Sequence, residues 1–504
     1  MPESSQTPFV SARYSRRRSI QALCSAWLIP FTNASWAKQD LGAELHMLNR
    51  LSSGPNAAGL KAIAQQGSRA WIAAQLQPER IATPPELSHQ LAALGSLNQS
   101  PLELAKLYRQ VNEAAKTDNE AGKALRRAEL ERVAVEGAQA RVWRALRSDQ
   151  QLKEQMVDFW FNHFNVFRGK GLCRVLVGHY EEHAIRPHAM GRFRDILGAT
   201  FAHPAMLFYL DQWQSAKPGF VGLNRAKNQA SGLNENYARE LMELHTLGVD
   251  GGYMQRDVTE LARMLTGWTL DLRPQANTPG LTVFDPKRHD DGSKQWLGKT
   301  VVGAGADEAK QALDLLARHP STARHIAYKL VQYFVSDQPS PNLVRQLAER
   351  FITTDGDIRA VLAVLLESTE FLSASQVQSK FKTPLRYVIS CLRACDSRAD
   401  NIRPVLAALQ QLGMPLHGCQ TPDGYKNTEA AWLNPDAMER RISFATALGT
   451  GRLRIDEQGL TPDGVAIRAL LDPLISDHTR KVLAQNPPKL GAALLLGSPE
   501  FMRH

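Results

Sequence analysis

The sequence lacks the short motifs that identify the commonest enzyme classes. It contains no GxSxG nucleophile elbow, no phosphate-binding P-loop, and no GxGxxG directly after an expected strand. Neither CxxC nor CxxCH occurs, which argues against a zinc ribbon and a covalently attached c-type haem. These absences weaken the case for a serine hydrolase, an ATP-dependent enzyme or an NAD-dependent enzyme.

Cysteine is also scarce, with five residues in a chain of 504. Cys24 lies in an N-terminal segment that we expect to be removed, so the mature chain keeps Cys173, Cys391, Cys395 and Cys419. Cys391 and Cys395 are four positions apart on an expected helix and share a face. The sequence leaves open whether they form a disulfide, bind a soft metal or are two small buried side chains.

Long apolar runs are absent beyond the N-terminus. No later segment reaches the roughly 18 to 20 apolar residues that a membrane-spanning helix needs, so we expect none. The N-terminus itself has arginines at Arg16, Arg17 and Arg18, then a short apolar stretch, then small residues ending at Ala37. This pattern predicts a secretory signal peptide over residues 1–37. SRRRSIQ also resembles a twin-arginine signal, so we expect export by the Sec or the twin-arginine route, to the periplasm or beyond.

Basic residues exceed acidic ones only modestly. The chain has 60 Lys and Arg against 50 Asp and Glu, a net charge of +10 and a pI near 9.4. The excess is dispersed rather than gathered in a basic, aromatic-bearing stripe, so nucleic-acid binding is not expected. A mild attraction to acidic polymers, such as an anionic polysaccharide, fits this balance better.

Helical periodicity dominates the mature chain. Apolar residues recur at helical spacing, which predicts a mainly α fold: one large multi-helix, bundle-like domain over residues 38–504. We divide it into an N-terminal helical part (about 38–155), a core motif region (about 156–303) and a C-terminal helical part (about 304–504). Residues 277–303 break the helical period between Gly, Pro and Asp turns, and predict a small β-hairpin or irregular insertion.

The most polar stretch of the helical pattern is NENYARELMELHTLGVDGGY, which begins at Asn234. On an ideal helix Asn236, Glu240 and Glu243 share one face, while Glu235 and Arg239 form a pair four positions apart on an adjoining face. One half of the stretch therefore predicts a structural ion pair. The other half presents two carboxylates together.

Two carboxylates one turn apart repel each other unless a cation, an arginine or water lies between them. In helical bundles, inward-facing glutamates and a nearby histidine commonly hold iron or manganese. Candidate histidines stand in FNHF and in KRHDD. The predicted ligands of a divalent or redox metal are His163, Glu240, Glu243 and His289, and the predicted catalytic residues are Asp290 and Arg239. The alternative is that the same residues form a buried ion-pair network, with His163 a satisfied core histidine.

HYEEH, from His179 to His183, matches the HxxEH pattern of one class of zinc protease. The pattern fixes only three residues and occurs easily by chance. A solvated helix end is therefore the favoured interpretation.

Several longer segments closely resemble a large bacterial family, named domain of unknown function 1800. They include FWFNHF, IRPHAMGRFRDIL, HPAMLFYLD, HDDGSKQWLG, HPSTARHIAYKL, FKTPLRYV, AAWLNP and the whole block from Asn234 to Thr269. The resemblance covers nearly all of the mature chain. It implies an exported, mostly α-helical protein that is often encoded beside an exported sulfatase-like protein. The motif residues carried over are His163, Arg186, Asp211, Asn234, Glu235, Asn236, Arg239, Glu240, Glu243, Asp257, Glu260, His289, Asp290 and Lys294.

Two functions remain in view from the sequence. The first is an exported, metal-dependent enzyme, a hydrolase or an oxidoreductase, that acts on an extracytoplasmic polymer such as a polysaccharide. The second is a non-catalytic envelope protein that assembles with, or matures, the sulfatase-like protein. A structural network should be saturated with Arg and Lys partners and should have no pocket, whereas a metal site should bring two or more carboxylates and a histidine together within about 5 Å, with an open face.

Overall fold

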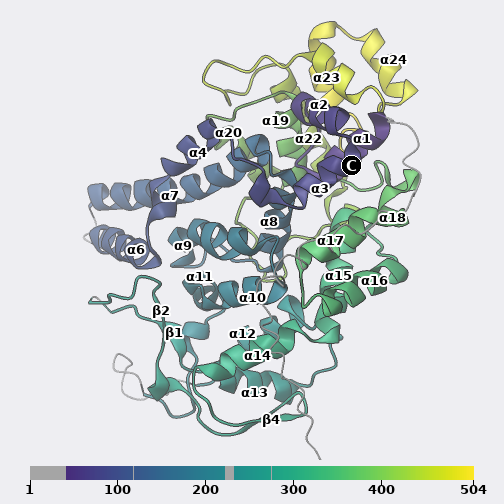
Figure 1. The fold of residues 1–504 in the computed structure, drawn as a ribbon. Helices are drawn as coiled ribbons and strands as arrows, with labels where there is room; N and C mark the ends of the chain where they lie inside the picture. Colours follow the sequence, from purple (N-terminus) through teal and green to yellow (C-terminus); the bar gives the residue numbers. More distant parts are fainter. Residues whose placement is uncertain (1–40, 117–118, 222–231, 274) are drawn as a thin grey trace, which may run out of the picture. The chain divides into compact units, whose positions relative to one another are not determined.

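Helices make up most of the chain, because apolar residues recur every three or four positions along nearly every segment. The structure, a computed structural model, describes residues 41–116, 119–221, 232–273 and 275–504. Leu41–His504 form one compact unit (Figure 1). Helices and two small two-stranded sheets make up its regular structure, so the predicted mainly α fold class is confirmed. The predicted signal peptide lies outside the described residues.

The N-terminal part contributes seven helices to the described chain. Its helices are α1 (Leu41–Leu51), α2 (Ala57–Gln66), α3 (Ser68–Gln75), α4 (Pro85–Ala92), α5 (Gly95–Asn98), α6 (Pro101–Lys116) and α7 (Glu120–Arg147). The last two lie side by side in Figure 1 and pack along much of their length. Asn119 is the N-cap of the long helix α7, and its side chain accepts a hydrogen bond from the Gly122 amide. No helix among these or the other described ones is long and apolar enough to cross a membrane.

The central part surrounds helix α8, whose side chains are nearly all buried. Its helices are α8 (Gln151–His163), α9 (Cys173–Tyr180), α10 (Phe193–Ala202), α11 (Pro204–Tyr209), α12 (Asn236–Glu240) and α13 (Gln255–Leu265). Two π-helical turns continue these helices, η2 (Glu181–Ile185) after α9 and η5 (Leu241–His245) after α12. Such turns are rare and often lie at functional sites.

Two hairpins form the β structure. Strand β1 (Trp268–Leu270) pairs antiparallel with β2 (Thr282–Phe284), and β3 (Lys294–Trp296) pairs antiparallel with β4 (Lys299–Val301). Leu297 and Gly298 join β3 to β4, and both have positive φ, at 47° and 73°. Two successive positive φ values are typical of a tight type I′ hairpin turn. The insertion predicted over residues 277–303 is therefore present, but its first strand begins earlier in the chain.

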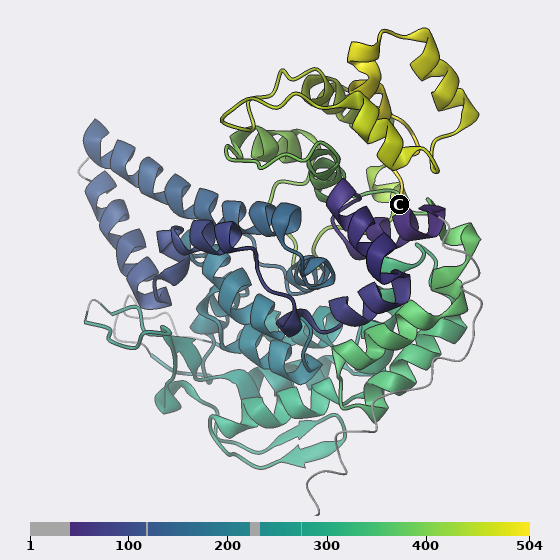
Figure 2. The same cartoon turned by 45° about the horizontal axis from the view of Figure 1, so that its top comes forward.

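The C-terminal part is again helical. Its helices are α14 (Asp307–Ala317), α15 (Pro320–Phe334), α16 (Pro341–Thr353), α17 (Ile358–Glu367), α18 (Thr369–Leu372), α19 (Pro384–Ala394), α20 (Arg403–Gln411), α21 (Glu429–Trp432), α22 (Pro435–Gly449), α23 (Gly464–Leu471), α24 (Asp477–Gln485) and α25 (Gly491–Leu496). The last three gather at one end of the unit, drawn yellow in Figures 1 and 2.

Buried arginines hold these parts together by binding the carbonyl groups at helix ends. Arg50, at the end of α1, donates to the carbonyls of Phe334 and Val335 at 3.3 and 3.1 Å. Arg393, in α19, donates to the carbonyls of Ala145 and Leu146 at 3.1 and 2.8 Å. The last carbonyls of a helix have no partner within it, and a cation there is also favoured by the helix dipole. These arginines therefore cap α15 and α7 from distant parts of the chain.

Candidate functional site

The polar block that begins at Asn234 folds into α12 and the π-helical turn η5. Glu240 is the last residue of α12, and Glu243 lies in η5. Both side chains are partly buried. Among the described residues, neither carboxylate has a hydrogen-bond or ion-pair partner. The two predicted carboxylates are thus presented as a pair without an ion-pair partner among the residues that the structure describes.

The environment of Glu240 favours its protonated form. Burial first, and then the charges of Glu243 and Asp423, raise the pKa of Glu240 to about 7, although the charge of Arg239 opposes them. A carboxyl group with this pKa can both give and take a proton near neutral pH. Perturbed carboxyls of this kind are concentrated at functional sites.

Three other acidic side chains between Asn234 and Thr269 are fully engaged. Glu235 accepts from Thr259 at 2.6 Å and from Gln255 at 2.8 Å, and pairs with Arg239 at 3.4 Å. Asp257 accepts from the amides of Met254 and Leu297, and Glu260 pairs with Arg263 at 2.9 Å. Arg239, predicted to be catalytic, is therefore bound to Glu235 and Gln255. The open pair stands out against these saturated neighbours.

Asp423 reaches Glu240 from the far C-terminal part because helix α8 holds its loop. Asn162 and Tyr425 exchange two hydrogen bonds, at 2.8 and 2.7 Å, through the Tyr425 carbonyl and amide. Asn165 donates to the carbonyls of Cys419 and Thr421. Between these anchors Gly424 has φ of 72°, and a Cβ there would lie 2.2 Å from the Asn162 carbonyl oxygen. Only glycine fits this close approach, so the FNHFN segment and Gly424 together set the position of Asp423.

Asp423 is held in its ionised form. Burial alone would raise its pKa, but hydrogen bonds from Lys426 and Thr421 outweigh that effect and lower the pKa. The Lys426 ammonium lies 2.6 Å from the carboxylate. The cluster therefore combines an ionised Asp423 with a Glu240 that is largely protonated below neutral pH. Two carboxyl groups whose environments separate their pKa values in this way can serve as base and acid.

His163 contacts this cluster through Lys329 of α15. The His163 Nε2–H donates to the His245 carbonyl at 3.0 Å, so Nδ1 accepts from the Lys329 ammonium, also at 3.0 Å. Burial and the charge of Lys329 hold the pKa of His163 well below its usual range. Burial likewise lowers the pKa of Lys329 to about 8, and the charge of Asp423 opposes that decrease. His163 is thus a neutral ring with both nitrogens occupied, which orients a partly buried lysine.

His289 and Asp290 lie in a different network. His289 Nδ1 faces the Thr266 carbonyl at 2.8 Å and Nε2 faces Glu308 at 2.9 Å. Two acceptors require a proton on each nitrogen, and they raise the pKa of His289 although burial alone would lower it. Lys294 completes a buried triad with Glu308 at 2.6 Å, and Asp290 pairs with Arg263 at 2.8 Å. These contacts fix the β3–β4 hairpin to α13 and α14.

The predicted metal ligands thus fall into two sets with different partners. Within the ranges that the structure describes, no three His, Cys, Asp or Glu side chains are placed to hold a metal ion. The metal assignment stays a prediction. Of its four predicted ligands, Glu240 and Glu243 have carboxylate oxygens without a partner among the described residues, whereas both ring nitrogens of each histidine are hydrogen-bonded. The four described cysteines are free thiols, so the structure shows no disulfide among them.

HYEEH belongs to a third network, along the side of α8. Glu182 pairs with Arg144 at 2.7 Å, and Glu181 pairs with Arg141 at 2.9 Å and with His417 at 2.8 Å. Glu181 is buried, so the expected solvated helix end is wrong: arginines of α7 supply its partners. The motif residue Arg186 joins this network through Glu154 at 2.7 Å. The HYEEH carboxylates are therefore explained by structural ion pairs.

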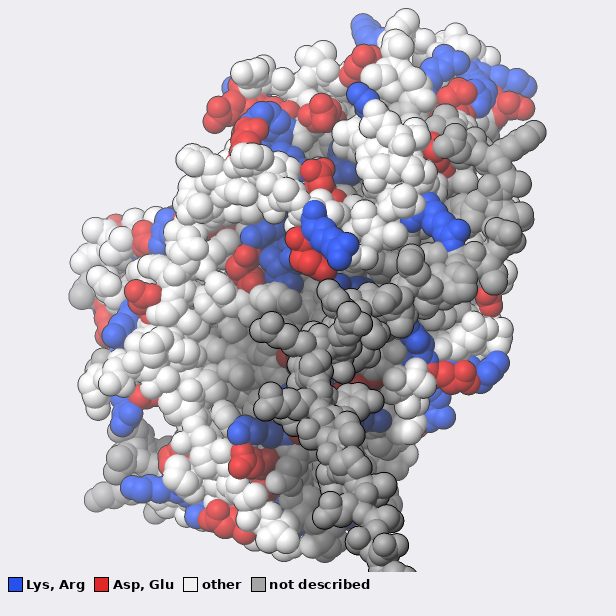
Figure 3. All heavy atoms as spheres, in the orientation of Figure 1, with Lys and Arg blue, Asp and Glu red and all other residues white. Residues whose placement is uncertain are grey.

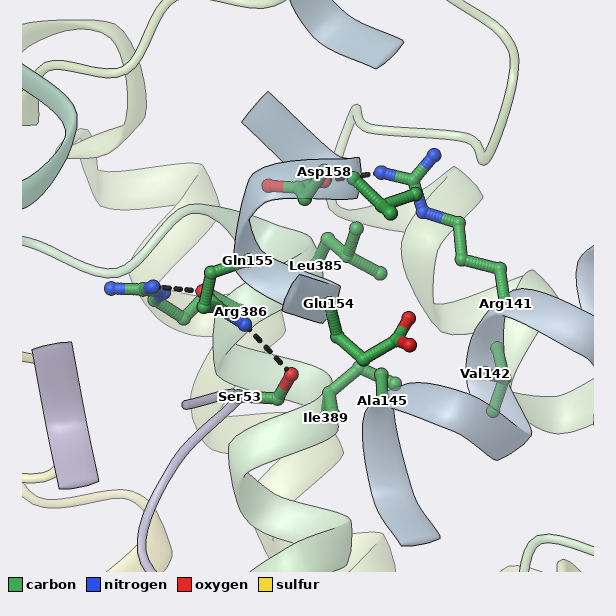
Figure 4. A pocket seen from close by; sticks show the side chains of 11 residues that line it. Ser53, Arg141, Val142, Ala145, Glu154, Gln155, Asp158, Leu385, Arg386 and Ile389 are labelled. Carbon is green, nitrogen blue, oxygen red and sulfur yellow. Dashed lines mark hydrogen bonds and ion pairs between the residues drawn. The ribbon is translucent and has the colours of Figure 1, made fainter. Parts of the chain in front are cut away.

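Two small cavities follow this network. The first, of about 30 Å³, is bordered by both apolar and charged side chains, and in Figure 4 Asp158 points toward Arg141 while Gln155 bridges Ser53 and Arg386. The second, of about 20 Å³, is lined by Asn162, Asn165, His417 and Tyr425 among others, and shares Arg141 and Asp158 with the first. Each has room for one or two waters. Spaces of this size are far smaller than a substrate pocket.

Sequence reasoning missed two members of the cluster, Lys329 and Asp423. Lys329 stands in a segment that the sequence did mark, because HPSTARHIAYKL resembles a family motif. The contact of Lys329 with His163, and the effect of Asp423 on Glu240, depend on the packing of α15 and of the Cys419–Tyr425 loop against α8. Periodicity carries no information on such distant contacts.

Charged side chains are interspersed on the visible surface. On the face shown in Figure 3, outside the grey atoms, Lys and Arg lie beside Asp and Glu rather than in a stripe of one sign. This face resembles an ordinary solvated surface.

Comparison with known proteins gives one informative result. No curated protein and no solved structure matches the chain significantly. A family model described as protein of unknown function, DUF1800, matches residues 46–503. Because that match spans nearly the whole described chain, the protein belongs to the DUF1800 family.

Proposed function

We propose that this protein is an exported hydrolase that cleaves an extracytoplasmic polymer, such as a polysaccharide, with Glu240 and Glu243 as its reacting carboxylates. Glu240 would give its proton to the leaving oxygen as the bond to that oxygen breaks. Glu243 would take a proton from the attacking water, whose oxygen forms the new bond. The balance of atoms is that of a simple hydrolysis.

The observation that carries this proposal is the lack of partners for the two carboxylates. Natural proteins pair their buried and half-buried charges, and this chain does so at Glu235, Glu260, Asp290 and Glu308. Glu240 and Glu243 break that rule together. Keeping two carboxylates side by side destabilises the fold, which is the usual cost of a reaction centre.

Export is supported by the N-terminal sequence pattern. The arginines at Arg16–Arg18 and the small residues up to Ala37 fit a cleaved signal. Expression of the full chain in a bacterium, followed by fractionation and intact mass measurement, tests this. We expect a periplasmic or secreted product that begins after Ala37; an uncleaved cytoplasmic product would contradict it.

The enzymatic part is tested by incubating the mature protein with neutral and acidic polysaccharides and measuring new reducing ends from pH 5 to pH 8. Loss of a general acid or base usually costs 10²- to 10⁴-fold, so Glu240→Gln and Glu243→Gln should each fall at least about 100-fold. The rate of the wild type should decline above pH 7 as Glu240 loses its proton. Glu235→Gln, which alters a paired carboxylate on the same helix, is the matched control and should keep most of the activity.

Elemental analysis of the same proteins distinguishes a proton from a metal ion at the pair. A divalent cation that is present in the wild type and lost in both glutamine variants would make the pair a metal site, as the sequence first predicted. Equal rates in the wild type and Glu240→Gln would reject the hydrolase proposal.

A second candidate is the non-catalytic role, in assembly or maturation of an exported sulfatase-like protein. It is favoured by the saturated networks around Arg186 and His289, in which motif residues of this chain are engaged in ion pairs. Co-expression with an exported sulfatase-like protein tests this role. A stable complex that survives Glu240→Gln, with no polymer cleavage by either form, would support it over the hydrolase.

A further inference from the structure

We propose that Lys329 binds an anionic group of the substrate, a carboxylate or a sulfate ester of an acidic polysaccharide, at the Asp423 end of the carboxylate cluster. This inference rests on the proposed function, because it takes the pair as the place where the polymer is cleaved. It adds the class of polymer and a residue that selects it.

The place of the Lys329 ammonium is fixed by a neutral partner. His163 is only 1% exposed, and its Nε2–H is committed to the His245 carbonyl at 3.0 Å. Its Nδ1 therefore offers a lone pair to Lys329, also at 3.0 Å. This contact positions the ammonium but leaves its charge uncompensated, because the imidazole is neutral.

Three other shielded lysines of the described residues have a carboxylate, whereas the partly buried Lys153 and Lys217, like Lys329, have none within ion-pair distance there. Lys170 pairs with Asp211 at 2.7 Å, Lys294 with Glu308 at 2.6 Å, and Lys380 with Asp337. Lys382 lacks one, but its ammonium is fully enclosed and lies over the ring of Phe501. Lys329 has no carboxylate within ion-pair distance among the described residues, and two of its three N–H groups remain for a ligand.

The surroundings of Lys329 favour an anion from outside. Its side chain is only partly buried, so solvent reaches it. Asp423, whose negative charge acts on Lys329, already forms an ion pair with Lys426 at 2.6 Å. His163, His245 and His325 around it are neutral, since burial and the lysine charge lower their pKa values. A bound carboxylate or sulfate would compensate the positive charge of Lys329. The net positive charge of the chain would also favour the approach of an acidic polymer.

Calorimetric titration of oligosaccharides into the mature protein tests the proposal, in a Glu240→Gln background that prevents turnover. The probes are oligogalacturonate, a chondroitin sulfate oligosaccharide, and a neutral cello-oligosaccharide of similar length. We expect at least one acidic probe to bind more than tenfold tighter than the neutral one. Lys329→Met should weaken the acidic probe by about 10- to 100-fold, the usual effect of losing a charge-assisted contact, and leave the neutral probe unchanged.

Two further variants keep the result decisive. Lys329→Arg retains the charge and should keep binding within about tenfold of the parent. Lys170→Met removes a lysine that already has its carboxylate and should change binding less than twofold. Failure of every acidic probe to bind the parent, or equal losses in Lys329→Met and Lys329→Arg, would overturn the inference.

The inference and the proposed function fail in different ways. Unchanged acidic binding in Lys329→Met overturns the role of Lys329 while leaving polymer cleavage by Glu240 intact. Equal cleavage by the wild type and Glu240→Gln rejects the hydrolase while leaving anion binding at Lys329 measurable.

Discussion

Replacing Glu240 by glutamine should stabilise the protein above pH 7 while it removes the proposed activity. The substitution keeps the shape of the side chain and removes its charge. In the wild type, Glu240 is partly buried beside Glu243, has no ion-pair partner among the described residues, and is only partly compensated by the charge of Arg239. The neutral amide removes that unfavourable charge, so the unfolding free energy should rise.

The sign and the size follow from the pKa. Burial first, and Glu243 second, raise the pKa of Glu240 from 4.5 to about 7. A carboxyl with a raised pKa contributes stability that is fully present below pH 4.5 and is lost as the pH rises through 7. A pKa that differs by one between the folded and unfolded states corresponds to about 1.4 kcal/mol, and solvent screening of a partly exposed group reduces the total to about 2 kcal/mol. Glu240→Gln should therefore gain about 2 kcal/mol over the wild type at pH 8 and nothing at pH 4.5 or below.

Denaturant unfolding at pH 4.5, 6, 7 and 8 measures this difference directly. The matched control is Glu235→Gln, five positions earlier, which loses its ion pair with Arg239 at 3.4 Å and should be destabilised at all these pH values except the lowest. A Glu240→Gln variant that is less stable than the wild type at pH 8, or a gain that does not change with pH, would refute the reasoning. It would mean that Glu240 belongs to a structural network.

Three other predictions concern the surroundings of the site. Gly424→Ala should abolish the proposed activity and lower the thermal unfolding temperature, because its Cβ would lie 2.2 Å from the Asn162 carbonyl oxygen. The control is Gly413→Ala, at a position with φ of 80° and nothing within 4 Å, which should lose only about 1 kcal/mol through backbone strain. His289→Gln should destabilise the protein more at pH 6 than at pH 8.5. The raised pKa of His289 contributes stability that is fully present below pH 6.5 and is lost as the pH rises through the folded-state pKa. An equal loss at both pH values in denaturant unfolding would contradict the doubly protonated ring. The described cysteines should all react with N-ethylmaleimide after unfolding without reductant, and mass spectrometry that finds two of them blocked would contradict the free thiols.

Local chemistry explains the part of the fold that the sequence predicts. Helical periodicity identifies the long helices, because one face of each must be apolar to pack. The Gly, Pro and Asp turns around residues 277–303 identify the β insertion, and Leu297-Gly298 supplies its tight turn. The pairing of Glu240 with Glu243 also follows from spacing alone, since residues three apart lie on one face of a helix.

The parts that sequence reasoning misses depend on contacts between distant segments. Glu181 and Glu182 read as solvated because their arginine partners, Arg141 and Arg144, are 40 and 38 positions away. His289 reads as a metal ligand until Glu308 is placed against its second nitrogen. The π-helical turns η2 and η5 carry no sequence signal either, because tertiary packing imposes them.

The arginine caps also set the order in which the chain can complete its fold. Arg386 donates to the Asn49 carbonyl, 337 positions earlier, and Arg393 donates to the Gly54 carbonyl, 339 positions earlier. The end of the first helix can therefore be bound only after more than three quarters of the chain has been synthesised. Contacts of such long sequence separation form slowly, since the entropy of closing the intervening loop is lost before they contribute. A chain tied in this way should fold late and as one cooperative whole, and a fragment that stops before α19 should lose the ordered end of α1 as well.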